Sequence, residues 1–390
     1  MGRLDREESA MSEVQPFRID VTPVEVEDLI DRLRRTRFAE QLPGEEWAKG
    51  VPASWLRTAV QAWQEQDWSM TQDRLNAFPQ IVTEIDGQRV HAIHVTSKHD
   101  EATPLLLLHG WPGSFLEFVD LIGPLVNPTA HGGDAADAFH VVIPSLPGHG
   151  FSSPLAGEGW TDLRMGDALG DLMFTLGYER FAVQGGDAGA FIGPQCARAH
   201  PDAVIGVHVN ALVNFPGPDD NPDELTEAEK ERVQRQQHFL AEMSGYREQQ
   251  QTRPQTLAYA LTDSPAGQLA WIAEKFAEWS DPHHVLTKDP AFLPTLLADA
   301  SIYWFTGTAG SSANLYWETM HNPEAWTKSV SGVPTAVLVS LTQDVAIRRY
   351  AERENRIVRW TETERGGHFM ALEAPEVWLE DVRAFFRSLR

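Results

Sequence analysis

The amino-acid sequence predicts an α/β fold in which a mostly parallel sheet is interrupted by a helical insertion. Short apolar runs end in Gly/Pro/Ser-rich turns and are mostly followed by helix-like segments, a pattern typical of buried parallel strands. These runs cover 105–108, 141–143, 181–183 and 335–339. Between 215 and about 328 the strand pattern stops and polar helical sequence replaces it. Because the strand pattern resumes at 333, we expect the insertion to lie within one α/β domain.

Composition and charge narrow the class of partner. The 390 residues include 32 Lys and Arg against 56 Asp and Glu, which gives a formal net charge of −24. Nucleic acids and anionic membranes select basic surfaces, so the composition argues against both and favours a neutral small molecule. No apolar stretch approaches the roughly 20 residues that a membrane span requires. The single cysteine, Cys196, cannot form an intramolecular disulfide, and with the polar N-terminus it favours a cytoplasmic protein.

Two helices and a hairpin are expected before the first of the apolar runs. Apolar residues recur at helical spacing within 22–36 and again within 55–63. Alternating apolar and polar residues then fill 81–95, with Asp86-Gly87 near the centre. Asp-Gly favours a two-residue hairpin turn, so this region is predicted to pair two strands.

One glycine-rich turn carries a candidate nucleophile. The sequence Gly185-Gly186-Asp187-Ala188-Gly189 follows an apolar run and precedes a helix-like segment. This is the nucleophile-elbow pattern with aspartate in the place of serine. Glycine suits it because a strained turn brings backbone segments together and leaves no room for Cβ atoms. The same pattern also fits a plain strand-to-helix turn in which Asp187 caps the helix.

A second turn supplies a candidate oxyanion hole. The motif HGWPGS at 109–114 directly follows a strand-like run. In α/β hydrolases this turn donates one backbone N–H to the oxyanion, here that of Trp111, and the residue after the nucleophile, here Ala188, donates another. His109 itself is interpreted as a structural residue that bonds to neighbouring backbone.

A third turn supplies a candidate base. The motif GGHF at 366–369 contains His368 and lies between a short strand and a terminal helix. The chain order nucleophile, acid, histidine is that of α/β hydrolases, and Asp344 follows the strand at 335–340, where the acid belongs. The carboxylates that could replace Asp344 are those of Glu352, Glu354 and Glu364.

No metal or cofactor site is predicted. His91 and His94 lie three apart on an expected strand and therefore point to opposite faces. The adjacent His283 and His284 lack partner ligands at metal spacing. The glycine-rich turns lack the contexts that cradle phosphates in nucleotide-binding proteins.

Together these motifs identify a resemblance that runs from about residue 17 to the C-terminus: the chain resembles the microsomal-type epoxide hydrolase family. Its landmarks occur in order as HGWPGS at 109, PGHGFS at 147, GGDAG at 185, DSPAG at 263, YWFTGT at 303 and GGHF at 366. The resemblance implies an α/β-hydrolase fold with a helical lid and an N-terminal extension. The expected division is a flexible leader at 1–14, the family's N-terminal region at 15–95, a core at 96–212 and 329–390, and a lid at 213–328.

The resemblance also implies roles for individual residues. Asp187 matches the nucleophile, His368 the base and Asp344 the acid that orients it. Lid tyrosines of this family donate hydrogen bonds to the epoxide oxygen, and the matching positions are Tyr246 and Tyr316. Tyr303 is a competitor for the second role. Two departures from the family are expected: Ala188 occupies a position where many relatives have tryptophan, and we expect no counterpart of the membrane anchor of the mammalian enzymes.

The function implied is a cofactor-free epoxide hydrolase. It would use water to convert a bulky apolar or aromatic epoxide to a vicinal diol through a covalent ester on Asp187, in detoxification or in the synthesis of a natural product. A homo-oligomer stays open. One alternative is a haloalkane-type dehalogenase, although Ala188 removes a usual halide donor. Another is a catalytically silent hydrolase-fold binding protein, because fold alone does not prove function.

Overall fold

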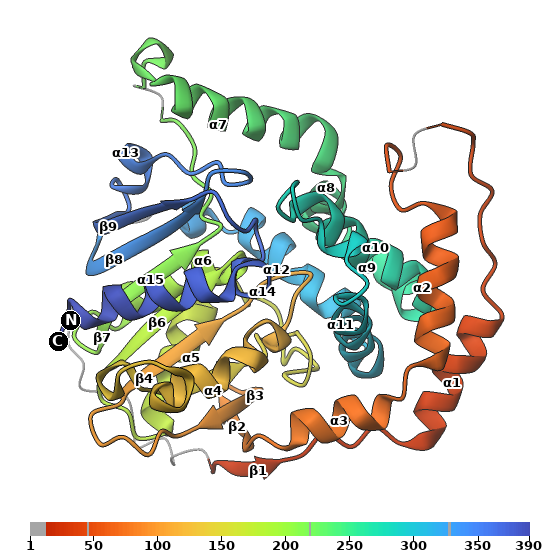
Figure 1. The fold of residues 1–390 in the computed structure, drawn as a ribbon, viewed down its shortest axis with the longest axis horizontal. Helices are drawn as coiled ribbons and strands as arrows, with labels where there is room; N and C mark the ends of the chain where they lie inside the picture. Colours follow the sequence, from red (N-terminus) through yellow and green to blue (C-terminus); the bar gives the residue numbers. More distant parts are fainter. Residues whose placement is uncertain (1–12, 45–46, 218–219, 327–328) are drawn as a thin grey trace.

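A nine-stranded sheet forms the centre of this computed structural model, which describes residues 13–44, 47–217, 220–326 and 329–390 (Figure 1). Within those residues the strand order is β1-β2-β3-β5-β4-β6-β7-β8-β9. The strands are β1 (Gln15–Phe17), β2 (Gln80–Ile85), β3 (Gln88–Val95), β4 (Thr103–Leu108), β5 (Phe139–Pro144), β6 (Phe181–Gly186), β7 (Val204–Asn210), β8 (Ser331–Ser340) and β9 (Asn355–Thr363).

The sheet is parallel from β5 to β9 and antiparallel at the other edge. Leu105 of β4 pairs in parallel with Val141 of β5 on one side and with Ala182 of β6 on the other. Strands β1, β2 and β3 join β5 through antiparallel pairs. The predicted mostly parallel α/β fold is therefore confirmed.

The predicted hairpin is formed by β2 and β3. Its turn residues Asp86 and Gly87 have φ angles of 52° and 74°. Positive φ at both central residues matches the twist of the strands that a two-residue turn connects. The hairpin extends the parallel sheet beyond β5.

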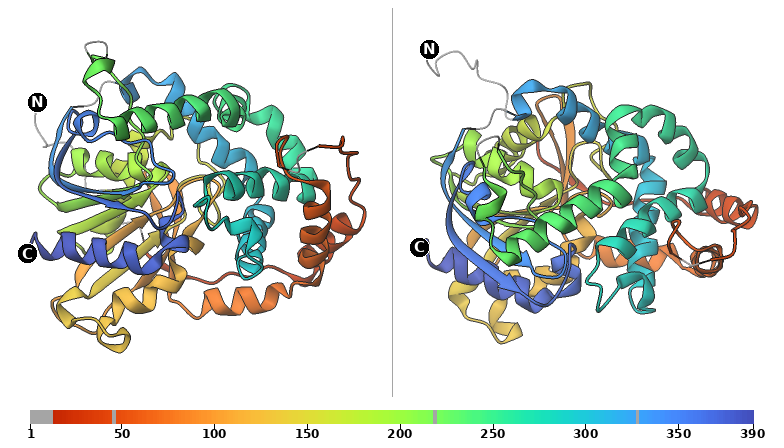
Figure 2. Two further views of the ribbon diagram at one scale, coloured as in Figure 1. Left: turned by 45° about the horizontal axis from the view of Figure 1, so that its top comes forward. Right: turned by 90° about the horizontal axis from the view of Figure 1, so that it is seen from above.

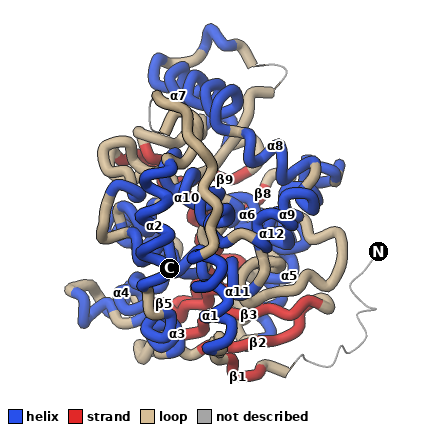
Figure 3. The backbone as a smooth tube through the Cα atoms, turned by 90° about the vertical axis from the view of Figure 1, so that its right-hand side faces the viewer, coloured by secondary structure: helices blue, strands red, loops and turns tan. Residues whose placement is uncertain are grey.

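Helices cover both faces of the sheet, as Figure 3 shows around the red strands. One face is covered by α5 (Asp162–Thr175) and α6 (Ala188–Ala199), and its core includes the buried Cys196. The other is covered by η1 (Phe115–Leu121), α4 (Ile122–Val126) and α15 (Pro375–Arg387). Shorter elements of the core are η2 (Pro128–His131), η3 (Ala135–Asp137), α13 (Arg348–Ala351) and α14 (Met370–Glu373).

The described residues between β7 and β8 form helices and loops without a strand. The helices are η4 (Pro222–Glu224), α7 (Glu227–His238), the π-helix η5 (Phe239–Met243), α8 (Gly245–Thr252), α9 (Pro254–Asp263), α10 (Pro265–Trp279), η6 (Leu286–Lys288), α11 (Leu293–Thr306), α12 (Ala309–His321) and η7 (Pro323–Trp326). We call this segment the lid. Helix α7 extends along its outer side (Figure 1).

The N-terminal helices pack mainly on the lid. Helices α1 (Pro23–Arg34) and α2 (Ala53–Glu65) share a hydrophobic cluster with α10 and α11, and the Trp63 indole donates to Ser301 Oγ at 2.8 Å. Figure 2 shows both helices on the lid side of the molecule, whereas α3 (Trp68–Asn76) leads back to the sheet. The expected leader at 1–14 lies outside the described residues up to residue 12. No described helix is long and apolar enough to cross a bilayer.

Candidate active site

Asp187 lies on the sharp turn between β6 and α6. Its backbone has φ 53° and ψ −120°, a conformation that costs a non-glycine residue free energy. The turn is tight because a Cβ on Gly185 would collide with the Gly189 carbonyl, and a Cβ on Gly189 would collide with the Leu108 carbonyl. Asp187 occupies the N-cap position of α6, yet its side chain makes no capping hydrogen bond. The carboxylate of Asp187 therefore does not cap the helix and is free to make other contacts.

The HGWPGS turn after β4 contacts this carboxylate. The backbone N–H of Trp111 donates to Asp187 Oδ1 at 3.0 Å. Asp187 also fills the space that a Cβ on Gly110 would need, so a larger residue there would displace the carboxylate. Ala188 is the first residue of α6, and its N–H therefore has no acceptor within the helix. His109 bonds to neighbouring backbone through both ring nitrogens, in agreement with a structural role.

His368 reaches the other carboxylate oxygen from the loop between β9 and α14. Its Nε2 lies 3.1 Å from Asp187 Oδ2. Burial disfavours charge on the imidazole, but the Asp187 carboxylate outweighs that effect and raises the pKa of His368. The two motifs that are 181 residues apart in the sequence thus meet at one carboxylate.

Asp344 is a buried carboxylate on the loop after β8. Its Oδ2 accepts a hydrogen bond from the Ser340 N–H at 2.7 Å. Burial raises the pKa of Asp344 to about 6, while that hydrogen bond and the charge of His368 act in the opposite direction. The alternative acids Glu352, Glu354 and Glu364 are exposed.

Glu373 is a second carboxylate near His368 that the sequence reading did not single out. Its Oε1 accepts from the Phe369 N–H at 2.9 Å and its Oε2 from the Asp281 N–H at 2.6 Å. Burial raises the pKa of Glu373 to about 7, against these hydrogen bonds. Its position at the end of α14 gave no sequence signal, because carboxylates on short helices are usually solvated. Glu373 therefore links the loop that carries His368 to Asp281, which lies two residues after the end of the lid helix α10.

The two lid tyrosines contact each other beside Trp111. Tyr246 of α8 and Tyr316 of α12 have ring centroids 5.9 Å apart at 85°, and Trp111 stacks on Tyr246 at 5.1 Å and 9°. Burial raises the pKa of Tyr246, and the negative charge of Asp187 raises it further. Burial also raises the pKa of Tyr316. Both phenols therefore keep their protons at neutral pH.

The competitor Tyr303 is engaged elsewhere. Its hydroxyl donates to the Gly113 carbonyl at 2.9 Å, and the residue is 1% exposed. A hydroxyl committed to this backbone oxygen stabilises the turn that carries Trp111.

A cavity of about 750 Å³ opens in front of Asp187 and His368. Its wall is largely apolar, and charged residues of α7 and α8 form part of the lining. The apolar side chains include those of Phe191, Leu212, Val213, Phe215, Phe239, Leu240, Met243 and Trp279. Such a cavity suits a small molecule that is largely hydrophobic.

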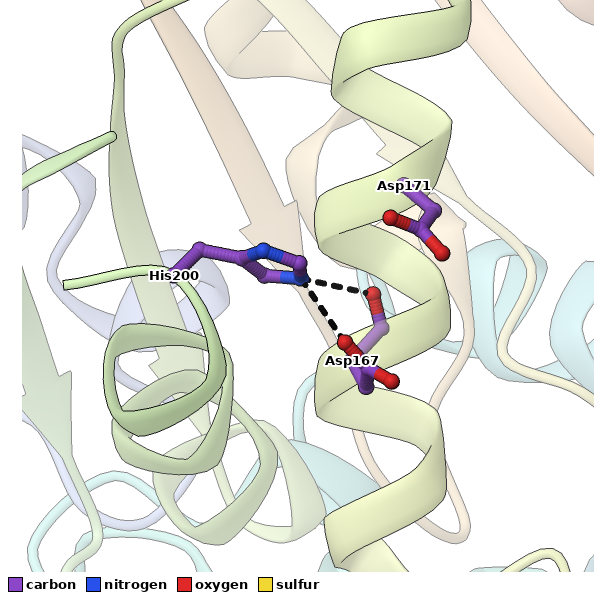
Figure 4. Close-up of side chains that lie close together, drawn as sticks. All are labelled: Asp167, Asp171 and His200. Carbon is purple, nitrogen blue, oxygen red and sulfur yellow. Dashed lines mark hydrogen bonds and ion pairs between the residues drawn. The ribbon is translucent and has the colours of Figure 1, made fainter. Parts of the chain in front are cut away.

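Among the described residues, one group of three could bring ligand atoms together for a metal ion: Asp167, Asp171 and His200 (Figure 4). His200 Nε2 lies 3.0 Å from the Asp167 backbone carbonyl and 3.1 Å from its Oδ1. A nitrogen that bonds to a carbonyl carries a proton, and a protonated nitrogen cannot bind a metal. This arrangement ties α6 to α5 rather than forming a metal site.

The amino-acid sequence matches two known protein families and is similar to a known protein. The family described as "Epoxide hydrolase N terminus" matches residues 14–118, and the family described as "alpha/beta hydrolase fold" matches residues 103–375. A protein of Stigmatella aurantiaca (strain DW4/3-1) named "Putative epoxide hydrolase" is 41% identical over 384 residues, which cover 97% of this chain and 86% of that protein. The chain belongs to the epoxide hydrolase family.

Family members from animals and fungi extend the similarity. "Epoxide hydrolase 1" of Oryctolagus cuniculus is 31% identical over 95% of this chain and 88% of its own. The structure of Aspergillus niger epoxide hydrolase has a TM-score of 0.84 at 30% identity and covers 97% of both chains. Juvenile hormone epoxide hydrolase from the silkworm Bombyx mori has a TM-score of 0.86 at 30% identity, covering 97% of this chain and 95% of that one. The family predicted from the motifs is confirmed.

Proposed function

We propose that this epoxide hydrolase converts a bulky apolar or aromatic epoxide and water to a vicinal diol through a covalent ester on Asp187. The observation that carries the proposal is that the two carboxylate oxygens of Asp187 have different partners. Oδ1 accepts the Trp111 N–H, and Oδ2 faces His368. One oxygen is thus held by a backbone donor, while the other lies beside a base.

Ring opening uses the nucleophile and the two phenols. Asp187 Oδ2 attacks an epoxide carbon and forms a carbon–oxygen bond while the ring carbon–oxygen bond breaks. The electron pair goes to the epoxide oxygen, which takes a proton from Tyr246 or Tyr316. Neutral phenols suit this role because their raised pKa values keep the proton available.

Ester hydrolysis uses His368 and the oxyanion donors. His368 removes a proton from water, which attacks the Asp187 carbonyl carbon, and the Trp111 and Ala188 N–H groups stabilise the charge on Oδ1. The bond between that carbon and Oδ2 then breaks, and the diol leaves with Oδ2, which takes the proton from His368. Asp187 keeps the water oxygen, and its new carboxyl proton restores the phenol. Esterification removes the negative charge of Asp187, which is what raises the pKa of His368 in the free protein. The pKa of His368 therefore falls once the ester has formed. The imidazole is then neutral and can take a proton from the attacking water.

The cavity supports the proposed substrate class. Its volume of about 750 Å³ leaves room for a group much larger than an epoxide ring, and aromatic and aliphatic side chains form most of the wall. Ala188 contributes a small side chain beside the nucleophile. A bulky apolar or aromatic substituent fits these surroundings.

The test is a single turnover in heavy-oxygen water with the protein in excess. The covalent route delivers an Asp187 oxygen to the substrate, so the first diol is mostly unlabelled and the label enters the Asp187 peptide. Direct attack of water on the epoxide gives the reverse distribution and would reduce Asp187 to a base. Asp187→Asn, which cannot form the ester at first exposure, is the control.

Two further assays test the alternatives. Halide release from chloroalkanes beside diol formation from an aromatic epoxide distinguishes a dehalogenase, and turnover of an epoxide panel distinguishes a silent binding protein. No described contact favours either one. The cytoplasmic location and a homo-oligomeric state stay predictions.

A further inference from the structure

Lys275 of α10 is a buried cation next to one of the two phenols. Its side chain is 2% exposed. Its Nζ lies 5.0 Å from the centre of the Tyr246 ring and 5.9 Å from that of the Trp279 ring. Both distances fall within the range of about 6 Å over which a cation is attracted to an aromatic face.

Burying an ammonium group is costly, and the cost here is met by two carboxylates. Lys275 Nζ lies 2.6 Å from Glu278 Oε2 and 2.7 Å from Glu274 Oε1, and both glutamates keep about 28% of their side chains exposed. A methionine would fill the same space without desolvating a charge. Packing alone therefore does not explain a lysine at this position.

The other neighbours of Tyr246 leave its ring little freedom. Trp111 stacks on it at 5.1 Å, Trp279 contacts it at 5.2 Å and Tyr316 at 5.9 Å. The ring is thus held in one orientation, and the charge of Asp187 acts on its hydroxyl. A charge over this ring acts on an ordered group rather than on a mobile one.

We propose that Lys275 is a positioning residue for epoxide opening, which rests on the proposed function. Its ammonium group holds the Tyr246 ring and stabilises the electron density that the ring gains as its hydroxyl gives a proton to the epoxide oxygen. The other charges that act on the Tyr246 hydroxyl are the negative Asp187 and Glu278 and the positive Arg247.

This role predicts an effect on one half-reaction only. Tyr246 gives its proton to the epoxide oxygen during ring opening, whereas ester hydrolysis needs no proton from this phenol at the attacked carbon. A cation that acts through Tyr246 therefore changes the rate of ester formation and leaves ester hydrolysis unchanged. General loosening of the lid would alter both rates.

The experiment measures the two single-turnover rates in Lys275→Met. We expect ester formation to slow about tenfold, the size of a cation–π interaction in a desolvated site, and ester hydrolysis to stay within about twofold of the wild type. Lys288→Met makes the same change at an exposed lysine and should alter neither rate. Combined with Tyr246→Phe, Lys275→Met should cause no further loss. The proposal would be overturned if Lys275→Met left the rate of ester formation unchanged. It would also be overturned if Lys275→Met slowed ester formation equally in the wild type and in Tyr246→Phe.

A second variant keeps the proposal testable if Lys275→Met does not fold. Glu278→Gln removes a negative charge near Tyr246, while Glu274 still pairs with Lys275. Ester formation should rise severalfold, and only when the Tyr246 hydroxyl is present. No change in either background would contradict the role of Lys275. If wild-type protein forms no ester at all, the proposed function fails instead, so the two failures are distinguishable.

Discussion

The backbone N–H of His368 donates to the carbonyl oxygen of Trp279 at 2.9 Å, which ties the candidate base to the last residue of the lid helix α10. The loop that carries Asp344 is tied to the same place, because the Gln343 side chain donates to the Ser280 carbonyl at 2.5 Å. The Trp279 ring also lies 4.9 Å from the imidazole. The end of α10 therefore belongs to the framework that positions the candidate base and acid.

Removing either lid hydroxyl should slow ester formation. Tyr246→Phe and Tyr316→Phe each take away a protonated phenol on which the charge of Asp187 acts, and we expect a loss of about tenfold to a thousandfold, typical of a general acid. Rapid mixing under single-turnover conditions measures it. Tyr303→Phe is the matched control: it loses the bond to Gly113 and should lower the free energy of unfolding by about 1 kcal/mol without a selective effect on ester formation. Wild-type ester formation in Tyr316→Phe would remove that residue from the site.

Replacing the base should trap the intermediate. His368→Gln keeps a polar side chain of similar size but cannot accept a proton from water, so the protein should react with epoxide and then stall. Intact-protein mass spectrometry should show the protein plus one substrate mass. Asp187→Asn should show no adduct at first exposure. An unmodified His368→Gln protein that still binds substrate would mean that the histidine acts before the ester forms.

Two variants should separate the acid from its neighbour. Asp344→Asn removes a charge that acts on His368, and we expect ester hydrolysis to slow by about a hundredfold or more. Glu373→Gln retains one acceptor oxygen, so it should lower the free energy of unfolding by about 1–3 kcal/mol and slow ester hydrolysis less than tenfold. Decay of the adduct and thermal unfolding give the two numbers. The opposite ranking of the hydrolysis rates would make Glu373 the acid.

A buried network whose residues do not line the cavity should make stability depend on pH. Burial opposes the charge of Asp381, but hydrogen bonds with His208, Arg359 and Thr361 outweigh it and lower its pKa to about 2. An unfolded aspartate has a pKa of about 3.9. Between these values the unfolded chain binds more protons, so stability rises with pH.

The contribution of Asp381 is therefore complete above about pH 4 and is lost as the pH falls towards about 2. We expect it to be about 1–2 kcal/mol after allowance for solvent screening. Denaturant unfolding of the wild type and Asp381→Asn should differ most near neutral pH, and the difference should shrink in acid. A difference that stays constant down to about pH 2 would contradict the assignment.

The residues that sequence alone could locate lie in short turns with local constraints. Asp187, Trp111 and His368 each belong to a glycine-containing motif after a strand, and the parallel sheet brings the ends of those strands to one edge. The contact between Asp187 Oδ1 and the Trp111 N–H follows from two such turns. Local sequence was sufficient because local backbone geometry decides these positions.

Other elements escaped prediction because their partners are distant in sequence. Strand β7 contains Gly206, His208 and Asn210, which interrupt its apolar pattern. In the fold His208 contacts Asp381 and Asn210 accepts from Gln184, so both polar side chains are buried with partners. For the same reason, the sequence did not indicate that α1 and α2 pack on the lid. An amphipathic helix indicates which face is buried, but not against what.

Two parts of the lid, the π-helix η5 and the end of α10, differ in how freely their residues can change over evolutionary time. Phe239 and Met243 line the cavity, yet no residue of η5 is fully buried. Substitutions there reshape the cavity while disturbing little of the core. At the end of α10, by contrast, Trp279 contacts Tyr246 and the His368 loop at once, so most substitutions would damage catalysis before they changed specificity. A lineage acquiring a new substrate would accumulate its first changes in η5.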